Sequence, residues 1–198
     1  MRLSIVGAKW LGGEAVARLE AEGYEIANVV APDAGDRTAE TASRLGLPVR
    51  TLDGRRHVEA GDVADGVDVL LTIGSTAIVD AGARAKARLA ALGYHPSLLP
   101  RHRGSAAVEW TVKMGDAVAG GSIYHLEERL DAGAIAMQDW CHVRPGERAG
   151  DLWRRALAPM GLELTVRVLA HARAHGSVPA VRQDEAFATE APRLAREG

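Results

Sequence analysis

Apolar positions in the first half of the chain alternate between two spacings, one typical of buried strands and one of helices. Nearly continuous apolar runs predict buried strands at residues 2–7, 24–31 and 67–73. Apolar positions three and four apart predict helices at residues 11–22 and 38–45, and an alanine-rich helix that follows Gly74 and ends near Leu89. This alternation predicts an α/β fold with a mostly parallel sheet and helices on both of its faces.

The second half of the chain carries shorter elements. We expect a strand that ends near His95, a turn-rich loop to Gly104, a helix at residues 106–114, and strands at residues 120–126 and 135–143. Helical spacing over residues 148–175 predicts one or two helices broken near Pro159, and a polar tail begins at about residue 176. Because we find no linker or repeat, we expect residues 1–198 to form a single domain.

Composition is typical of a globular protein, with 47% hydrophobic and 25% charged residues in a chain of 198. The formal net charge of −2 lacks the basic excess of proteins that neutralise many phosphates, so no nucleic-acid partner is expected. No stretch approaches the ~18 consecutive apolar residues that span a bilayer, so no membrane association is expected. The single Cys141 and the absence of a signal-peptide pattern lead us to expect a cytoplasmic protein.

Two further motifs carry weak signals. The turn at residues 7–13 could hold an anion at a helix N-terminus, but it lacks the G-x-G-x-x-G spacing of dinucleotide-binding turns. His171 and His175 lie four apart on a predicted helix, but the sequence offers no glutamate between them and no evident third ligand. We therefore expect neither a nicotinamide or flavin cofactor nor a metal site.

The most informative segment is HPSLLPRHRG, residues 95–104, which directly follows a predicted strand. A loop in this position lies at the carboxyl edge of the sheet, where open α/β folds bind their ligands. The segment places His95 before Ser97-Leu98-Leu99-Pro100, and a downstream turn reads Leu130-Asp131-Ala132-Gly133. This combination resembles the 10-formyltetrahydrofolate-dependent formyltransferases, which carry an S-L-L-P loop after a histidine and an L-D-x-G turn.

The resemblance covers almost the whole chain. Residues 120–138 look like the family's strand, acidic turn and following strand, and Gln183 with residues 188–192 resembles the Q…A-T-x-A-P signature that ends its catalytic domain. The resemblance implies the Rossmann-like formyltransferase fold. In the methionyl-tRNA members a β-rich domain follows this signature; with the sequence ending at Gly198, we expect the catalytic domain alone.

Formyl transfer requires that an amine attack the formyl carbon, that an oxyanion be stabilised and that a proton leave the amine. The resemblance makes His95 and Asp131 the catalytic pair. His95 would donate to the oxyanion, while Asp131 would orient the imidazole and accept a proton, directly or through water. Taken singly, His95 could equally pack a loop and Asp131 could equally form a turn.

The resemblance implies 10-formyltetrahydrofolate as the formyl donor, bound at three turns that follow strands. Its predicted binding residues are Ile73, Gly74, Ser97, Leu98, Leu99, Pro100, Leu126, Glu127 and Glu128. Glu127 and Glu128 are also an alternative acid pair, ranked below Asp131. The basic cluster Arg101, His102 and Arg103 could meet an anionic acceptor or the folate's glutamate tail, or could simply be solvated.

One position departs from the family pattern, because Gly93 stands where the family has an asparagine. Loss of one oxyanion donor costs about 10²–10³ in rate, and Tyr94 should not replace it because neighbouring strand residues point to opposite faces. The segment from Tyr94 to Gly104 resembles most closely the hydrolase module of 10-formyltetrahydrofolate dehydrogenases. Three functions therefore stay open: transfer to an amine of a small molecule, which we expect, hydrolysis that releases formate, or folate binding with impaired catalysis.

Overall fold

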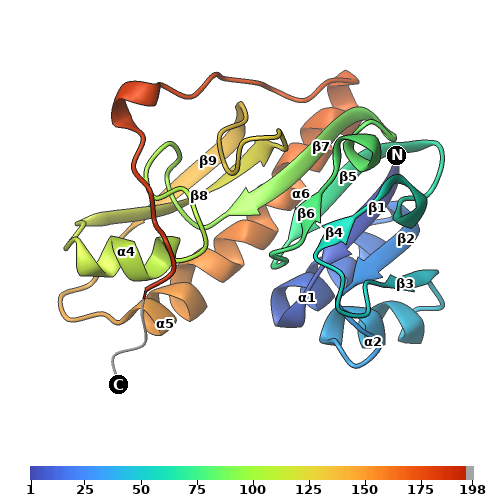
Figure 1. Ribbon diagram of the computed structural model, residues 1–198, viewed down its shortest axis with the longest axis horizontal. Helices are drawn as coiled ribbons and strands as arrows, with labels where there is room; N and C mark the ends of the chain where they lie inside the picture. The colour runs from blue at the N-terminus through green and yellow to red at the C-terminus, as the bar shows by residue number, and fades with distance from the viewer. Residues whose placement is uncertain (195–198) are drawn as a thin grey trace. The chain divides into compact units, whose positions relative to one another are not determined.

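Residue contacts divide the chain into two compact units. The computed structural model describes residues 1–194. The first unit consists of Met1–Gly93 with Leu169–Val178, and the second of Tyr94–Val168 with the segment from Pro179 onward. Figure 1 labels the strands β1 to β9 and the helices α1, α2, α4, α5 and α6.

Strands and helices alternate along the first unit, as the apolar pattern predicts. In order they are β1 Arg2–Gly7, α1 Lys9–Ala21, β2 Glu25–Ala31, α2 Arg37–Arg44, β3 Val49–Thr51, β4 His57–Val58, the 3₁₀ turn η1 Ala60–Asp62, β5 Val67–Ile73, β6 Ile78–Val79 and α3 Ala81–Arg84. Strand β7, Ala87–His95, begins in this unit. The apolar runs become buried strands because their side chains are covered on both faces: Leu3, Ile5 and Leu70 are each 0% exposed.

The second unit contains shorter elements and a long helix. They are α4 Ala107–Lys113, β8 Val118–His125, β9 Ile135–His142, α5 Ala149–Leu152, the π-helical turn η2 Trp153–Leu157, α6 Ala158–His175, which continues into the first unit, and the 3₁₀ turn η3 Glu185–Phe187. Apolar residues of α4, β8, α5 and η2 pack into one buried cluster around Leu152 and Leu157. Most of the predicted element bounds here are within two residues of the observed ones.

Among the described residues, the main sheet has seven strands in the order β3-β2-β1-β5-β7-β8-β9. Strand β1 pairs in parallel with β2 on one side and with β5 on the other, and β5 pairs in parallel with β7. Strands β8 and β9 form an antiparallel pair. The prediction of an α/β fold with a mostly parallel sheet is confirmed.

The prediction of an alanine-rich helix ending near Leu89 is wrong. The segment instead forms the short strand β6, the four-residue helix α3 and, from Ala87, the nine-residue strand β7. Alanine has the highest helix propensity, but tertiary contacts routinely override intrinsic propensity. Here the override is the pairing of β7 with β5, in which Ala90, Ala91 and Leu92 lie opposite Val69, Leu70 and Leu71.

The predicted helix break near Pro159 is also misplaced. The helix continues through Pro159, and the irregularity lies just before it, in the π-helical turn η2. Proline has no N–H, so it cannot bond to the carbonyl four residues earlier, and a wider turn upstream accommodates this loss. The carbonyl of Leu157, at the end of η2, accepts a hydrogen bond of 2.5 Å from the hydroxyl of Tyr94.

Candidate active site

The structure brings His95 and Asp131 together in the second unit. His95 is the last residue of β7, and Asp131 lies in the turn between β8 and β9. The Nδ1 atom of His95 is 3.5 Å from Oδ2 of Asp131, and each residue is only 6% exposed. The predicted pair is therefore adjacent and buried, while its role in catalysis stays a prediction.

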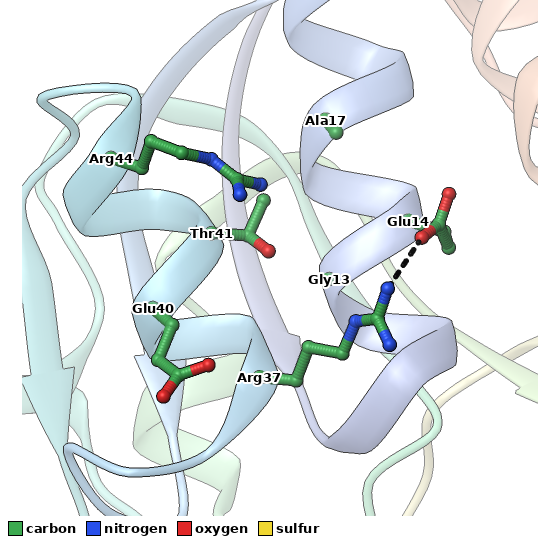
Figure 2. A pocket seen from close by; sticks show the side chains of 7 residues that line it. All are labelled: Gly13, Glu14, Ala17, Arg37, Glu40, Thr41 and Arg44. Carbon is green, nitrogen blue, oxygen red and sulfur yellow. Dashed lines mark ion pairs between the residues drawn. The ribbon is translucent and has the colours of Figure 1, made fainter.

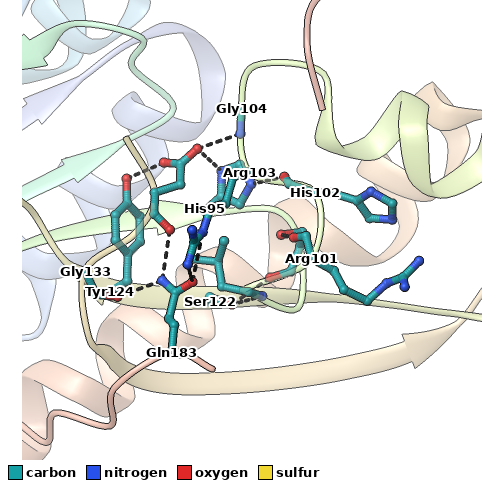
Figure 3. A network of polar contacts seen from close by, with 12 residues as sticks. His95, Arg101, His102, Arg103, Gly104, Ser122, Tyr124, Gly133 and Gln183 are labelled. Carbon is teal, nitrogen blue, oxygen red and sulfur yellow. Dashed lines mark hydrogen bonds and ion pairs between the residues drawn. The ribbon is translucent and has the colours of Figure 1, made fainter. Parts of the chain in front are cut away.

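Two donors fix the carboxylate of Asp131, one on each oxygen (Figure 3). The hydroxyl of Tyr124 donates to Oδ1 at 2.7 Å, and the amide of Gly104 donates to Oδ2 at 2.8 Å. Asp131 has a φ of 52°, in the left-handed region that aspartate tolerates better than most residues. Two residues later in the turn, Gly133 leaves no room for a side chain, because a Cβ there would lie 1.8 Å from the carbonyl oxygen of His125.

The tautomer of His95 follows from its second partner. Its Nε2 lies 2.8 Å from the backbone carbonyl of His102, and since a carbonyl only accepts, Nε2 carries a proton. In the neutral ring Nδ1 is then unprotonated and faces Asp131 beyond the usual hydrogen-bond distance. The nitrogen available for chemistry is therefore Nδ1, which becomes a donor once it gains a proton.

Tyr124 belongs to the site although the sequence did not single it out. Its ring meets that of His95 edge-on, with centroids 6.5 Å apart. Burial, and after it the neighbouring Asp131 carboxylate, raise the pKa of the Tyr124 hydroxyl well above its ordinary value, so it remains a donor. A usable signal was the strand period: Ser122 and Tyr124 share one face of a buried strand that leads into the Asp131 turn.

The Ser97–Pro100 loop is held by polar side chains of the two strands beside it. The hydroxyl of Ser122 donates to the carbonyl of Ser97 and accepts from the amide of Leu99, and Gln138 of β9 donates to both Ser122 and the carbonyl of Leu99. The Ser97 hydroxyl donates within the loop, to the carbonyl of Arg101, at 2.6 Å. These groups shape the loop, so the predicted contacts of Ser97, Leu98, Leu99 and Pro100 with folate stay predictions.

The other predicted folate-binding residues lie at strand ends in both units. Ile73 ends β5 and is followed by Gly74 in the left-handed region, in the first unit. Leu126, which is half-buried, and the exposed Glu127 and Glu128 follow β8 in the second unit. Glu127 also borders a cavity of about 530 Å³ whose other lining residues are Arg129, Ala132, Ala134, Arg182, Gln183 and Glu185. Binding of folate by these residues stays a prediction.

We expected Arg101, His102 and Arg103 to be solvated or to bind an anionic ligand. This expectation is wrong for His102 and Arg103. Arg103 is 1% exposed and pairs with Glu185, and His102 is 4% exposed with Nε2 2.7 Å from Asp116. Burial would raise the pKa of Asp116, but hydrogen bonds from His102 and Arg101 outweigh burial and lower it. Sequence alone could not reveal the pairing of Arg103 with Glu185, because the two residues are more than eighty positions apart in the chain.

A second cavity, of about 280 Å³, lies between α1 and α2 in the first unit (Figure 2). Its lining includes Arg37, paired with Glu14 at 3.5 Å, but none of the predicted site residues. Within residues 1–194, no group of three or more histidine, cysteine or acidic side chains is arranged to hold a metal ion. The same residues contain no helix that is long and apolar enough to cross a membrane.

Comparisons with known proteins agree on one family. The family model described as formyl transferase matches residues 37–169. The mitochondrial 10-formyltetrahydrofolate dehydrogenase of Mus musculus is 32% identical over 96% of this chain, and the methionyl-tRNA formyltransferase of Acidobacterium capsulatum is 36% identical over 80% of it. These matches span only 22% and 51% of the two relatives. A crystal structure of phosphoribosylglycinamide formyltransferase from Bacillus halodurans shares the fold, with a TM-score of 0.77 at 19% identity over 89% of this chain and 97% of that one.

Proposed function

Because the chain belongs to the formyl transferase family, we propose that it moves a formyl group from 10-formyltetrahydrofolate to an amine of a small molecule. The observation that carries this proposal is the buried His95–Asp131 pair at the end of β7, with 3.5 Å between Nδ1 and Oδ2. Both residues lie in the sequence motifs that resemble those of the family, and both are held by further hydrogen bonds.

The proposed reaction exchanges one carbon–nitrogen bond for another. The acceptor nitrogen attacks the formyl carbon, and the formyl oxygen becomes an oxyanion. His95, protonated on both nitrogens, donates from Nδ1 to this oxyanion, and the Asp131 carboxylate balances the imidazolium charge. Asp131 then accepts the proton that leaves the amine, directly or through water. The bond between the formyl carbon and the folate nitrogen breaks, and that nitrogen takes up the proton that Asp131 accepted, which returns Asp131 to its carboxylate form.

Hydrolysis is the second candidate, and the segment from Tyr94 to Gly104 favours it, because it resembles the hydrolase module of 10-formyltetrahydrofolate dehydrogenases most closely. Water is also a smaller nucleophile that needs no acceptor pocket. The 32% identity with a 10-formyltetrahydrofolate dehydrogenase is also consistent with it. In this case water attacks the formyl carbon, formate leaves, and the folate nitrogen is protonated as before.

One experiment separates the two candidates. Purified protein is incubated with 10-formyltetrahydrofolate, with and without a panel of small amines and initiator transfer RNA, and tetrahydrofolate, formate and formylated amine are quantified. Transfer predicts tetrahydrofolate that appears only with a small amine, together with an equal amount of its formyl product. Hydrolysis predicts formate at the same rate without any amine. Formylation of transfer RNA would contradict the small-molecule acceptor, and an absence of tetrahydrofolate in every reaction would contradict both candidates.

A further inference from the structure

The side chain of Arg103 places a charge in the interior of the second unit. A guanidinium that is 1% exposed must have its donors satisfied within the protein. Its terminal nitrogens donate to both carboxylate oxygens of Glu185, at 3.0 and 2.7 Å, and it also donates twice to Oε1 of Gln183, at 3.1 and 2.7 Å. The hydrogen bonds from Arg103 lower the pKa of Glu185 to about 2, so this ion pair persists at neutral pH.

The amide of Gln183 connects this buried cation to the turn that carries Asp131. Its oxygen accepts from Arg103, and its nitrogen donates to the backbone carbonyls of Asp131 at 2.9 Å and Gly133 at 2.7 Å. Gln183 is 6% exposed, so these groups have little access to water. Figure 3 shows the chain of contacts from Arg103 through Gln183 to the turn.

The backbone on both sides of Gln183 is also anchored. Two residues earlier, Val181 exchanges a pair of 2.8 Å backbone hydrogen bonds with Ile135, the first residue of β9. Further on, the amide of Arg103 donates to the carbonyl of Thr189 at 2.8 Å, and the amide of Ala191 donates to the carbonyl of Arg103 at 2.6 Å. The segment around Gln183 is therefore a fixed support and not a loose tail.

We propose that Gln183 is a positioning residue for catalysis, which holds the backbone of Asp131 and Gly133 so that the Asp131 carboxylate faces His95. The proposal rests on the proposed function of the His95–Asp131 pair. Tyr124 and Gly104 fix the carboxylate end of Asp131, and Gln183 fixes its backbone end. A displacement of about 1 Å in a reacting group can lower a rate about 10²-fold, so loss of this support should reduce turnover.

The variant Gln183→Glu separates the two contacts of Gln183. Glutamate has nearly the same shape and keeps an oxygen toward Arg103, but it replaces the N–H donors with an oxygen that faces two carbonyls. The matched control is Asp184→Ala, on the same segment, where an exposed carboxylate accepts from the amide of Ala186 and makes no contact with the Asp131 turn among residues 1–194. Both variants change one side chain of the segment, but only the first removes contacts with the Asp131 turn.

Three quantities are measured: kcat and KM for 10-formyltetrahydrofolate, the melting temperature, and hydrogen exchange of the Gly104 amide. That amide donates to Asp131, so its exchange reports the position of the carboxylate without any need for activity. For Gln183→Glu we expect kcat to fall about tenfold or more at unchanged KM, and the Gly104 amide to exchange faster than the loss of global stability explains. Asp184→Ala should match the wild type in kcat and in exchange.

A lowered melting temperature with wild-type kcat and wild-type exchange at Gly104 would overturn the proposal, because it would show a purely structural role. If Gln183→Glu does not fold, Gln183→Asn takes its place; its amide is one methylene too short, and wild-type kcat in that variant would equally overturn the proposal. An inactive wild-type protein would contradict the proposed function instead, and the exchange of Gly104 in the variants would still decide whether Gln183 positions Asp131.

Discussion

At the scale of single residues, the site depends on which groups hold the two predicted catalytic side chains. His95 is oriented by the carbonyl of His102 through Nε2, and Asp131 by donors on both of its oxygens. These supports are needed because a buried carboxylate without hydrogen bonds is strongly destabilising. The supporting residues thereby determine how closely His95 and Asp131 approach each other.

Tyr124→Phe should lower both stability and activity, since it removes one of the donors to Asp131. Hydrogen bonds to charged groups contribute about 1.5–3 kcal/mol, and we expect a loss of that size in the free energy of unfolding, with a lower kcat. The control is Tyr94→Phe, whose hydroxyl donates to the neutral carbonyl of Leu157 and should contribute about 0.5–1.5 kcal/mol. Denaturant unfolding and steady-state kinetics measure both effects. An equal loss in the two variants, with wild-type kcat in each, would contradict the assigned role of Tyr124.

At the scale of elements, the strands β1, β2 and β5 were predictable because their apolar runs are continuous and local. The structure of residues 77–89 was not predictable in this way. It depends on the pairing of β7 with β5, a contact between separate segments that alanine's helix propensity does not report. The same distinction applies to the site. The motifs around His95 and Asp131 are local, and Tyr124 lies only seven residues before Asp131. Arg103, by contrast, pairs with residues eighty or more positions away, and no local pattern reports that contact.

The turn between β8 and β9 should be intolerant of a side chain at Gly133. A Cβ at this position would lie 1.8 Å from the carbonyl oxygen of His125, so Gly133→Ala must displace backbone that carries Asp131. Overpacking of this kind costs about 1–3 kcal/mol and occasionally more; we expect the upper end of that range, with loss of activity. Gly61→Ala, at a position with nothing within 4 Å, should leave stability unchanged or slightly raised. Denaturant unfolding compares the two, and similar stabilities would show that the turn has room to adjust.

At the scale of the whole molecule, the family and the fold follow from evidence spread over the chain. The identity of the formyl acceptor does not follow from that evidence. The formyl transferase match covers residues 37–169, and the mostly parallel sheet agrees with it. The acceptor could not be predicted, because its recognition depends on loops whose conformation no local pattern specifies. The single domain, the folate contacts and the catalytic roles expected from the sequence remain predictions.

The most direct test of the central claim measures turnover of 10-formyltetrahydrofolate by His95→Ala, Asp131→Ala and the double variant. The claim is that the two residues act as one catalytic unit, so each single change should lower kcat by about 10²–10³. The double variant should be hardly worse than either single one, because residues that act together are strongly non-additive. Binding of a non-reactive folate should stay close to wild type in all three. Wild-type turnover in both single variants would contradict the account.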